Sequence, residues 1–100
     1  MDYYRLLFTQ RALNDLANIV GYVAEDDDEA ASRFGAALLD HVDLLKRFPR
    51  MGTVTRKRSP VRRLVHAPIL VYYQIHEATG LVEILALPAR IAQAEEILNP

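Results

Sequence analysis

The spacing of apolar residues changes once along this chain, and that change most constrains the fold. Between residues 10 and 45, apolar side chains recur three and four residues apart, which is typical of one face of an α-helix. Between residues 61 and 87 they gather in three short runs that predict strands. Helices grouped ahead of strands predict an α+β domain, in which a helical hairpin covers a largely antiparallel sheet.

The helical region divides into two helices at the acidic run of residues 25–29. Thr9 is a suitable N-cap for the first helix, and Asp27 or Asp28 for the second. Phe48-Pro49 ends the second helix, because the residue before a proline disfavours helical backbone. The two apolar stripes are Leu13, Leu16, Val20 and Val23, then Ala31, Phe34, Leu38, Val42 and Leu45.

Four segments have the pattern of strands, and together with the helices they give the order β-α-α-β-β-β. In the segment that ends at Phe8, Tyr4, Leu6 and Phe8 alternate with Tyr3, Arg5 and Leu7 as in a short strand. Residues 50–60 form a predicted polar, basic loop. Glu77–Gly80 suits a hairpin connection, with glycine supplying a positive φ. We therefore expect one domain over residues 1–100, with three to four strands. The predicted strands after the first are 61–66, 69–76 and 81–87, and residues 91–98 suggest a short terminal helix.

Composition excludes several classes of site. The chain has no cysteine, which excludes disulfides and thiolate zinc sites, and its three histidines lack the spacing of metal ligands. There is no glycine-rich phosphate loop, so we expect neither a metal nor a cofactor. The longest apolar stretch, residues 68–73, is far shorter than the ~20 residues that span a bilayer. We expect a cytoplasmic protein with no membrane partner.

Positive charge is concentrated in one segment although the formal net charge is −1. Residues 46–63 hold eight of the twelve Lys and Arg residues and no Asp or Glu. A charge run is often only a solvated face, and Lys46 and Arg47 also offset the negative end of the second helix. Eight uncompensated cations exceed that need, which favours a surface for an anionic partner. The predicted partner-binding residues are Arg47, Arg50, Arg56, Lys57, Arg58, Arg62, Arg63 and Arg90.

The order of elements and a series of local phrases resemble the ParE/RelE toxin superfamily over nearly the whole chain. The phrases are Phe8-Thr9, Ala12, Asp15-Leu16, Ile19, Tyr22, Ala30-Ala31, Phe34, Leu45, Phe48-Pro49, Gly52, Val61-Arg62-Arg63-Leu64, Pro68, Val71-Tyr72-Tyr73-Gln74-Ile75, Val82, Ile84-Leu85 and Ala89-Arg90. The resemblance implies the toxin of a type II toxin–antitoxin pair, neutralised by a cognate antitoxin. It would reach operator DNA only through that antitoxin.

Three positions depart from the family pattern. Ile69 and Leu70 stand where many members have an aromatic–arginine pair, and Leu87 stands where a histidine is common. RelE-like ribonucleases need basic and acid/base side chains on the sheet face that carries these positions, in order to cleave messenger RNA. The departures therefore favour the ParE-like branch, whose members inhibit DNA gyrase by binding it.

Two alternatives stay open at this stage. The first is a metal-independent, ribosome-dependent mRNA endoribonuclease like RelE, whose candidate catalytic residues are Arg62, Arg63, His66, Tyr73 and Arg90. His66 is the best-placed base, although strand-end histidines are more often ordinary surface residues, and His41 in the second helix is expected to be structural. Tyr72 and Tyr73 face opposite sides of their strand, so at most one contacts a ligand. The second alternative is an inactivated toxin that only binds its antitoxin and joins in repression.

Overall fold

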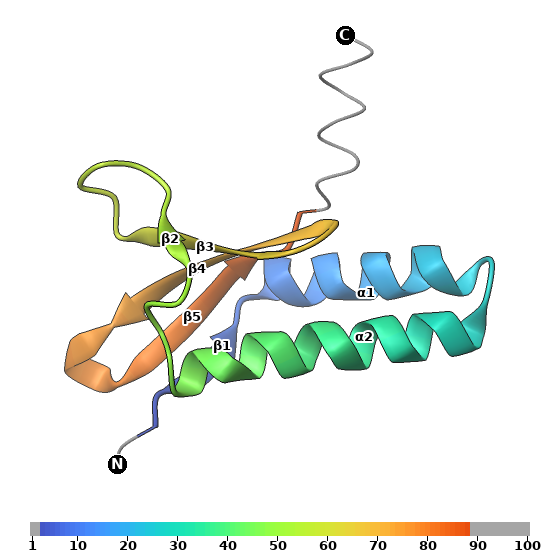
Figure 1. The fold of residues 1–100 in the computed structure, drawn as a ribbon, viewed down its shortest axis with the longest axis horizontal. Coiled ribbons are helices and arrows are strands. Elements are labelled where there is room, and N and C mark those ends of the chain that lie inside the picture. The colour runs from blue at the N-terminus through green and yellow to red at the C-terminus, as the bar shows by residue number, and fades with distance from the viewer. Residues whose placement is uncertain (1–2, 89–100) are drawn as a thin grey trace, which may run out of the picture.

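A computed structural model describes residues 3–88 as two helices packed on one face of a five-stranded sheet (Figure 1). The elements are β1 (Arg5–Phe8), α1 (Gln10–Ala24), α2 (Asp28–Asp43), β2 (Thr53–Val54), β3 (Val61–His66), β4 (Ile69–His76) and β5 (Leu81–Ala86), with single 3₁₀ turns at Leu44–Lys46 and Glu77–Thr79. The predicted α+β class is confirmed. Arg90 and the predicted terminal helix at 91–98 lie outside the described residues.

Side-chain caps start both helices where the sequence predicts. The Thr9 hydroxyl accepts a hydrogen bond from the Ala12 amide at 3.1 Å and donates one to the Leu85 carbonyl at 2.9 Å. It therefore satisfies a free amide and also fixes the start of α1 against β5. Asp27 caps α2 by accepting from the amides of Glu29 and Ala30.

The sheet has the strand order β1-β5-β4-β3-β2. β1 pairs parallel with β5, and all other neighbours are antiparallel. The predicted limits of β3 and β4 are confirmed, and Gly80 takes the expected positive φ of 63°. The sheet has five strands instead of three to four, because Thr53–Val54 pairs with Arg62 and Arg63. A strand of two residues has no alternation to detect, so only its pairing partner defines it.

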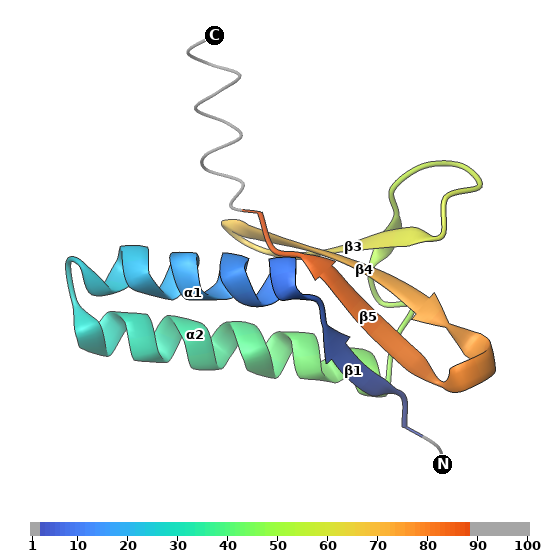
Figure 2. The same ribbon diagram turned by 180° about the vertical axis from the view of Figure 1, so that it is seen from behind.

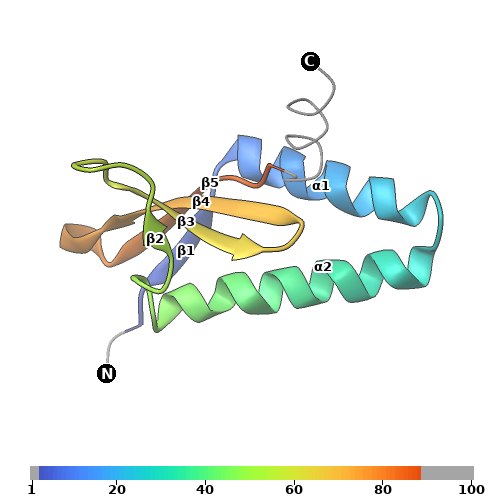
Figure 3. The same ribbon diagram turned by 45° about the horizontal axis from the view of Figure 1, so that its top comes forward.

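The core lies between the helices and one face of the sheet. Leu38, Val42 and Leu45 from the second helical segment meet Val71 and Tyr73 of β4, all fully buried. The opposite face of the sheet is not covered by α1 or α2. The turn between the helices and the loop between β2 and β3 project at opposite ends of the molecule (Figures 1 and 2). The view from the top shows the same separation (Figure 3).

Candidate functional site

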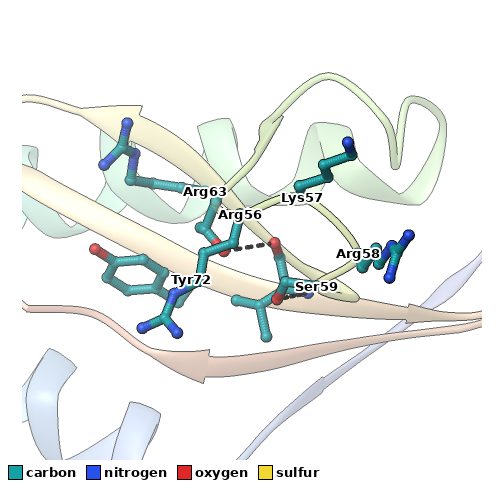
Figure 4. Close-up of a pocket in the computed structure, with 8 residues that line it drawn as sticks. Arg56, Lys57, Arg58, Ser59, Arg63 and Tyr72 are labelled. Atoms are coloured by element: carbon teal, nitrogen blue, oxygen red, sulfur yellow. Dashed lines mark hydrogen bonds between the residues drawn. The ribbon is translucent and has the colours of Figure 1, made fainter.

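An open pocket of about 720 Å³ lies where the β2–β3 loop meets the face of the sheet opposite α1 and α2. We call it the basic pocket. Four cations line it, and none of the described residues in its lining is acidic. Figure 4 shows the charged ends of these four side chains spread around the loop, not converging on one point. The lining is Thr55, Arg56, Lys57, Arg58, Ser59, Val61, Arg63 and Tyr72.

Short-range hydrogen bonds hold the loop that carries three of these cations. The Thr55 amide and hydroxyl both donate to the Val61 carbonyl, at 3.1 and 3.0 Å. The Ser59 hydroxyl accepts from the Val61 amide at 3.2 Å. Arg58 has a φ of 68°, a left-handed conformation that is uncommon for a residue with a side chain. The polar loop residues thus stabilise the loop itself and leave its charged ends at the surface.

The first part of the basic segment is used differently. Lys46 forms an ion pair with Asp43 at 2.8 Å, one helical turn earlier. Arg47 donates to the Tyr3 hydroxyl, and its guanidinium lies 5.1 Å from the centre of the Tyr3 ring. Both cations contact other residues of the protein. For Lys46, this contact agrees with the interpretation that it offsets the negative end of the second helix.

Arg50 forms an ion pair with Glu77, the residue after β4. Glu77 also accepts a hydrogen bond from the Tyr4 hydroxyl at 2.6 Å. The Tyr4 hydrogen bond and the Arg50 guanidinium hold the pKa of Glu77 below its usual value, whereas the bond to Glu77 raises the pKa of Tyr4. Three segments far apart in sequence therefore meet at one carboxylate. No local spacing in the sequence predicts this contact, because 73 residues separate Tyr4 from Glu77.

Tyr73 and Arg62 lie on the helix-facing side of their strands. Tyr73 is fully buried, donates to the Pro49 carbonyl at 2.6 Å and accepts from the Gly52 amide at 2.9 Å. Burial raises the pKa of its hydroxyl. Arg62 donates to the Gly52 carbonyl at 2.8 Å. A β-carbon on Gly52 would lie 2.6 Å from the Tyr73 hydroxyl oxygen, so this close approach requires glycine.

His66, at the end of β3, faces α2 and not the basic pocket. Its Nδ1 lies 2.8 Å from Nδ1 of His41, and its ring packs edge-on against Phe34. Partial burial, and then the nearby His41, lower the pKa of His66. One shared proton joins the two rings, which gives His41 the structural role that we expected.

The five candidate catalytic residues are not brought together. Arg63 lines the basic pocket, while Arg62, His66 and Tyr73 lie on the other side of the sheet, and Arg90 is outside the described residues. The two members of the tyrosine pair separate as expected, with Tyr72 on the pocket side. The positions that depart from the family pattern are apolar and buried: Ile69, Leu70 and Leu87 are at most 5% exposed. The tyrosine hydroxyl and the histidine that the endoribonuclease alternative needs are thus engaged elsewhere.

A second surface depression of about 650 Å³, which we call the β1–α2 groove, lies along the edge of the sheet. The side chains of Leu6 and Phe8 line it from β1, and Leu39 lines it from α2 with 41% of its surface exposed. Among the strands of residues 3–88, β1 is the end strand of the sheet, so one side of it has no neighbouring strand from this range. The full lining is Tyr3, Tyr4, Arg5, Leu6, Phe8, Leu39, Asp43 and Lys46.

Among residues 3–88, no three His, Asp or Glu side chains are grouped as a metal ion would need. Neither of the two long helices in this range has the length and apolar character to cross a bilayer.

Comparisons with known proteins identify the family. Residues 6–90 match the family described as "ParE toxin of type II toxin-antitoxin system, parDE". The chain belongs to the ParE toxin family. It is also 33% identical over 87 residues to a putative toxin, Y4kP, of Sinorhizobium fredii, which covers 85% of this chain and 90% of the relative. The protein is thus a toxin of the ParE/RelE superfamily of type II toxin–antitoxin systems.

Solved structures share the fold of this ParE-family toxin at low sequence identity. A chain of the chromosomal ParDE system from P. aeruginosa matches with a TM-score of 0.71 and 20% identity, covering 87% of this chain and 96% of that one. A chain of the RelBE2 toxin–antitoxin complex from Mycobacterium tuberculosis matches with a TM-score of 0.68 and 22% identity, covering 90% and 94%. The isolated E. coli RelE toxin matches with a TM-score of 0.58 and 13% identity, covering 95% and 98%. Both branches of the superfamily therefore share this architecture, and the fold does not separate them.

Proposed function

We propose that this toxin inhibits DNA gyrase by binding it, without covalent chemistry, and that a cognate antitoxin neutralises it. The observation that carries the proposal is the basic pocket: four cations beside the sheet face opposite α1 and α2, with no described carboxylate or histidine in the lining. Metal-free RNA cleavage needs a base and an acid at the reacting phosphate. A surface with cations alone suits binding.

The burial of the departing positions supports the same branch. Leu70 and Leu87 occupy positions where the superfamily resemblance implies basic or acid/base groups, and they are 5% and 1% exposed. His66 is hydrogen-bonded to His41, and the Tyr73 hydroxyl is hydrogen-bonded to backbone groups. The candidate acid/base groups of the endoribonuclease alternative are therefore committed to structural contacts on the helix side.

The test is a gyrase supercoiling assay with purified toxin in excess over gyrase. We expect supercoiling to fall with toxin concentration, and we expect a variant that loses two pocket charges, Lys57→Gln/Arg58→Gln, to need more toxin. The matched control is Arg33→Gln, which removes an exposed cation from α2, outside the pocket. Undiminished supercoiling at saturating toxin would count against the proposal.

The endoribonuclease and inactive-toxin alternatives have their own measurements. Primer extension on translated messages after induction would show cuts in the ribosomal A site if the toxin acted as RelE does. Normal growth after induction without antitoxin would favour a protein that only binds its partner.

For the antitoxin, we propose the β1–α2 groove as the docking surface. Its apolar lining and the unpaired side of β1 suit an amphipathic segment that adds a strand or lays a helix along the groove. Co-purification of the antitoxin, encoded beside the toxin, with tagged toxin tests this. We expect Leu39→Asp to abolish co-purification, with Leu13→Asp, an exposed position on α1 outside the groove, as the matched control. Equal recovery with Leu39→Asp and with the control would place the antitoxin elsewhere.

A further inference from the structure

We propose that the basic pocket binds the phosphate backbone of DNA, so that the toxin contacts the DNA that gyrase holds as well as the enzyme. This inference rests on the proposed function for the source of the DNA, but the contact itself belongs to this chain. Four cations, Arg56, Lys57, Arg58 and Arg63, form no ion pair with any residue in the described range 3–88. Their mutual repulsion is relieved by a bound polyanion.

The arrangement of the charges indicates an extended ligand. In Figure 4 the ends of Arg63, Lys57, Arg58 and Arg56 point in different directions around the loop. A single small anion would contact one or two of them. A strand with one phosphate per nucleotide passes several, and each neutralised phosphate releases a counterion into solution.

The lining distinguishes nucleic acid from an acidic protein segment. Cores of protein–protein interfaces are depleted in charged residues, whereas protein–DNA interfaces are polar and strongly positive. The basic pocket offers Val61 and the ring of Tyr72 as its apolar surface, beside four cations. Three of those cations are arginines, whose planar fork matches phosphate oxygens. The apolar β1–α2 groove has the opposite character, so the two surfaces suit different partners.

The loop is also prepared for binding. Hydrogen bonds of Thr55 and Ser59 to Val61 close its base, and Arg58 holds a left-handed backbone conformation. Because the backbone is already ordered, binding orders mainly side chains and costs less entropy than folding a loop. A non-glycine residue at positive φ occurs often at functional sites.

The experiment measures fluorescence anisotropy of a labelled 20-nucleotide DNA, as a single strand and as a duplex, titrated with purified full-length toxin from 50 to 200 mM salt. Contact of four cations with phosphates predicts that log K falls against log salt with a slope of about −3.6 for the duplex and about −2.8 for the single strand. For Lys57→Gln/Arg58→Gln we expect a duplex slope smaller by about 1.8 and an affinity about tenfold lower at 50 mM salt. Arg33→Gln is the matched control, with the wild-type slope.

Three results would overturn the inference. The first is equal DNA affinity of the wild type and the double variant, provided circular dichroism shows both folded. The second is equal displacement of the DNA by a poly-glutamate peptide of the same charge. The third is an RNA of the same sequence that binds about tenfold more tightly than the DNA, which would point to an RNA target.

The gyrase assay separates this inference from the proposed function. If the double variant lost DNA binding and inhibited gyrase as well as the wild type, the inference that the toxin contacts gyrase-held DNA would be wrong, and gyrase inhibition would stand with its contact surface outside the basic pocket. If the wild type bound DNA with the expected slope and left gyrase active, the DNA site would stand and the proposed target would be wrong.

Discussion

The basic segment of this toxin contains two regions that look alike in sequence and differ in structure. Lys46, Arg47 and Arg50 make contacts with Asp43, Tyr3 and Glu77 that tie the chain to itself. A few residues later, Arg56, Lys57, Arg58 and Arg63 line a pocket without any ion pair to residues 3–88. Position in the fold decides the difference. The first group lies beside the strand β1 and the β4–β5 connection, whereas the second lies on the projecting β2–β3 loop and, for Arg63, on β3.

The comparison shows that the predicted partner-binding cations differ in their contacts within the protein. Arg47 and Arg50, which are predicted to bind a partner, also contact Tyr3 and Glu77 of the chain itself, and their role in binding stays a prediction. Arg62 was assigned to the same surface, and its guanidinium donates to the carbonyl of Gly52. Among the described residues, four of the predicted partner-binding cations line the basic pocket. Four predictions test this division, from the largest expected effect to the smallest.

A substitution in the core is expected to change the free energy of unfolding more than any substitution in the two regions. Leu38→Ala removes a fully buried side chain of α2 that packs against the sheet. We expect the free energy of unfolding to fall by about 2–5 kcal/mol, because a cavity remains. Urea unfolding followed by circular dichroism measures it. A loss smaller than that of the exposed-cation variants Arg50→Gln and Lys57→Gln would show that the helices do not pack as described.

The Tyr73 hydroxyl binds the backbone at Pro49 and Gly52, close to where the first group of cations ends. Tyr73→Phe removes the hydroxyl that bonds the Pro49 carbonyl and the Gly52 amide, and leaves both backbone groups without that partner. We expect a loss of about 1–3 kcal/mol in the free energy of unfolding. The matched control is Tyr72→Phe, on the pocket side of the same strand, with no stability change expected. Equal losses in the two variants would contradict the described hydrogen bonds.

The His41–His66 contact predicts a pH dependence of stability. Burial lowers the pKa of His66 in the folded state below its unfolded value of ~6.5. Below pH ~6.5 the unfolded chain binds a proton that the folded His66 resists, so stability is full above that pH and falls as the pH decreases through the folded pKa. Thermal melts from pH 8 to pH 5 measure this. In His66→Gln we expect a smaller fall over this range, and an unchanged pH dependence would refute the role of His66.

The smallest effects are expected on the melting temperature, when one cation from each of the two groups is replaced. Arg50→Gln breaks the ion pair with Glu77, and we expect a small decrease in melting temperature that disappears at high salt. Lys57→Gln removes a pocket cation and should leave the melting temperature unchanged, because exposed charges contribute little stability. The same melting curve from both variants at low salt would remove the distinction between the regions.

Local features of the sequence were sufficient for most of the fold. The caps at Thr9 and Asp27 and the two apolar stripes determined the helices, and short runs of strand-forming residues determined β3 and β4. These features depend on residues a few positions apart, so physical rules of spacing detect them. The opposite orientation of Tyr72 and Tyr73 followed from the strand period in the same way. Asp43 and Lys46, one turn apart, also follow helix spacing.

Tertiary structure alone decided which cations are available and which acid/base groups are engaged. The pairing of Thr53–Val54 with β3, the contact of Arg50 with Glu77 and the contact of His41 with His66 join segments separated by 8 to 27 residues. Such contacts depend on how the strands and helices are placed in space, and single-sequence spacing does not encode that placement. The sequence therefore determined where positive charge lies along the chain, and the packing of β1, α2 and the β4–β5 connection determined how much of it remains for a partner.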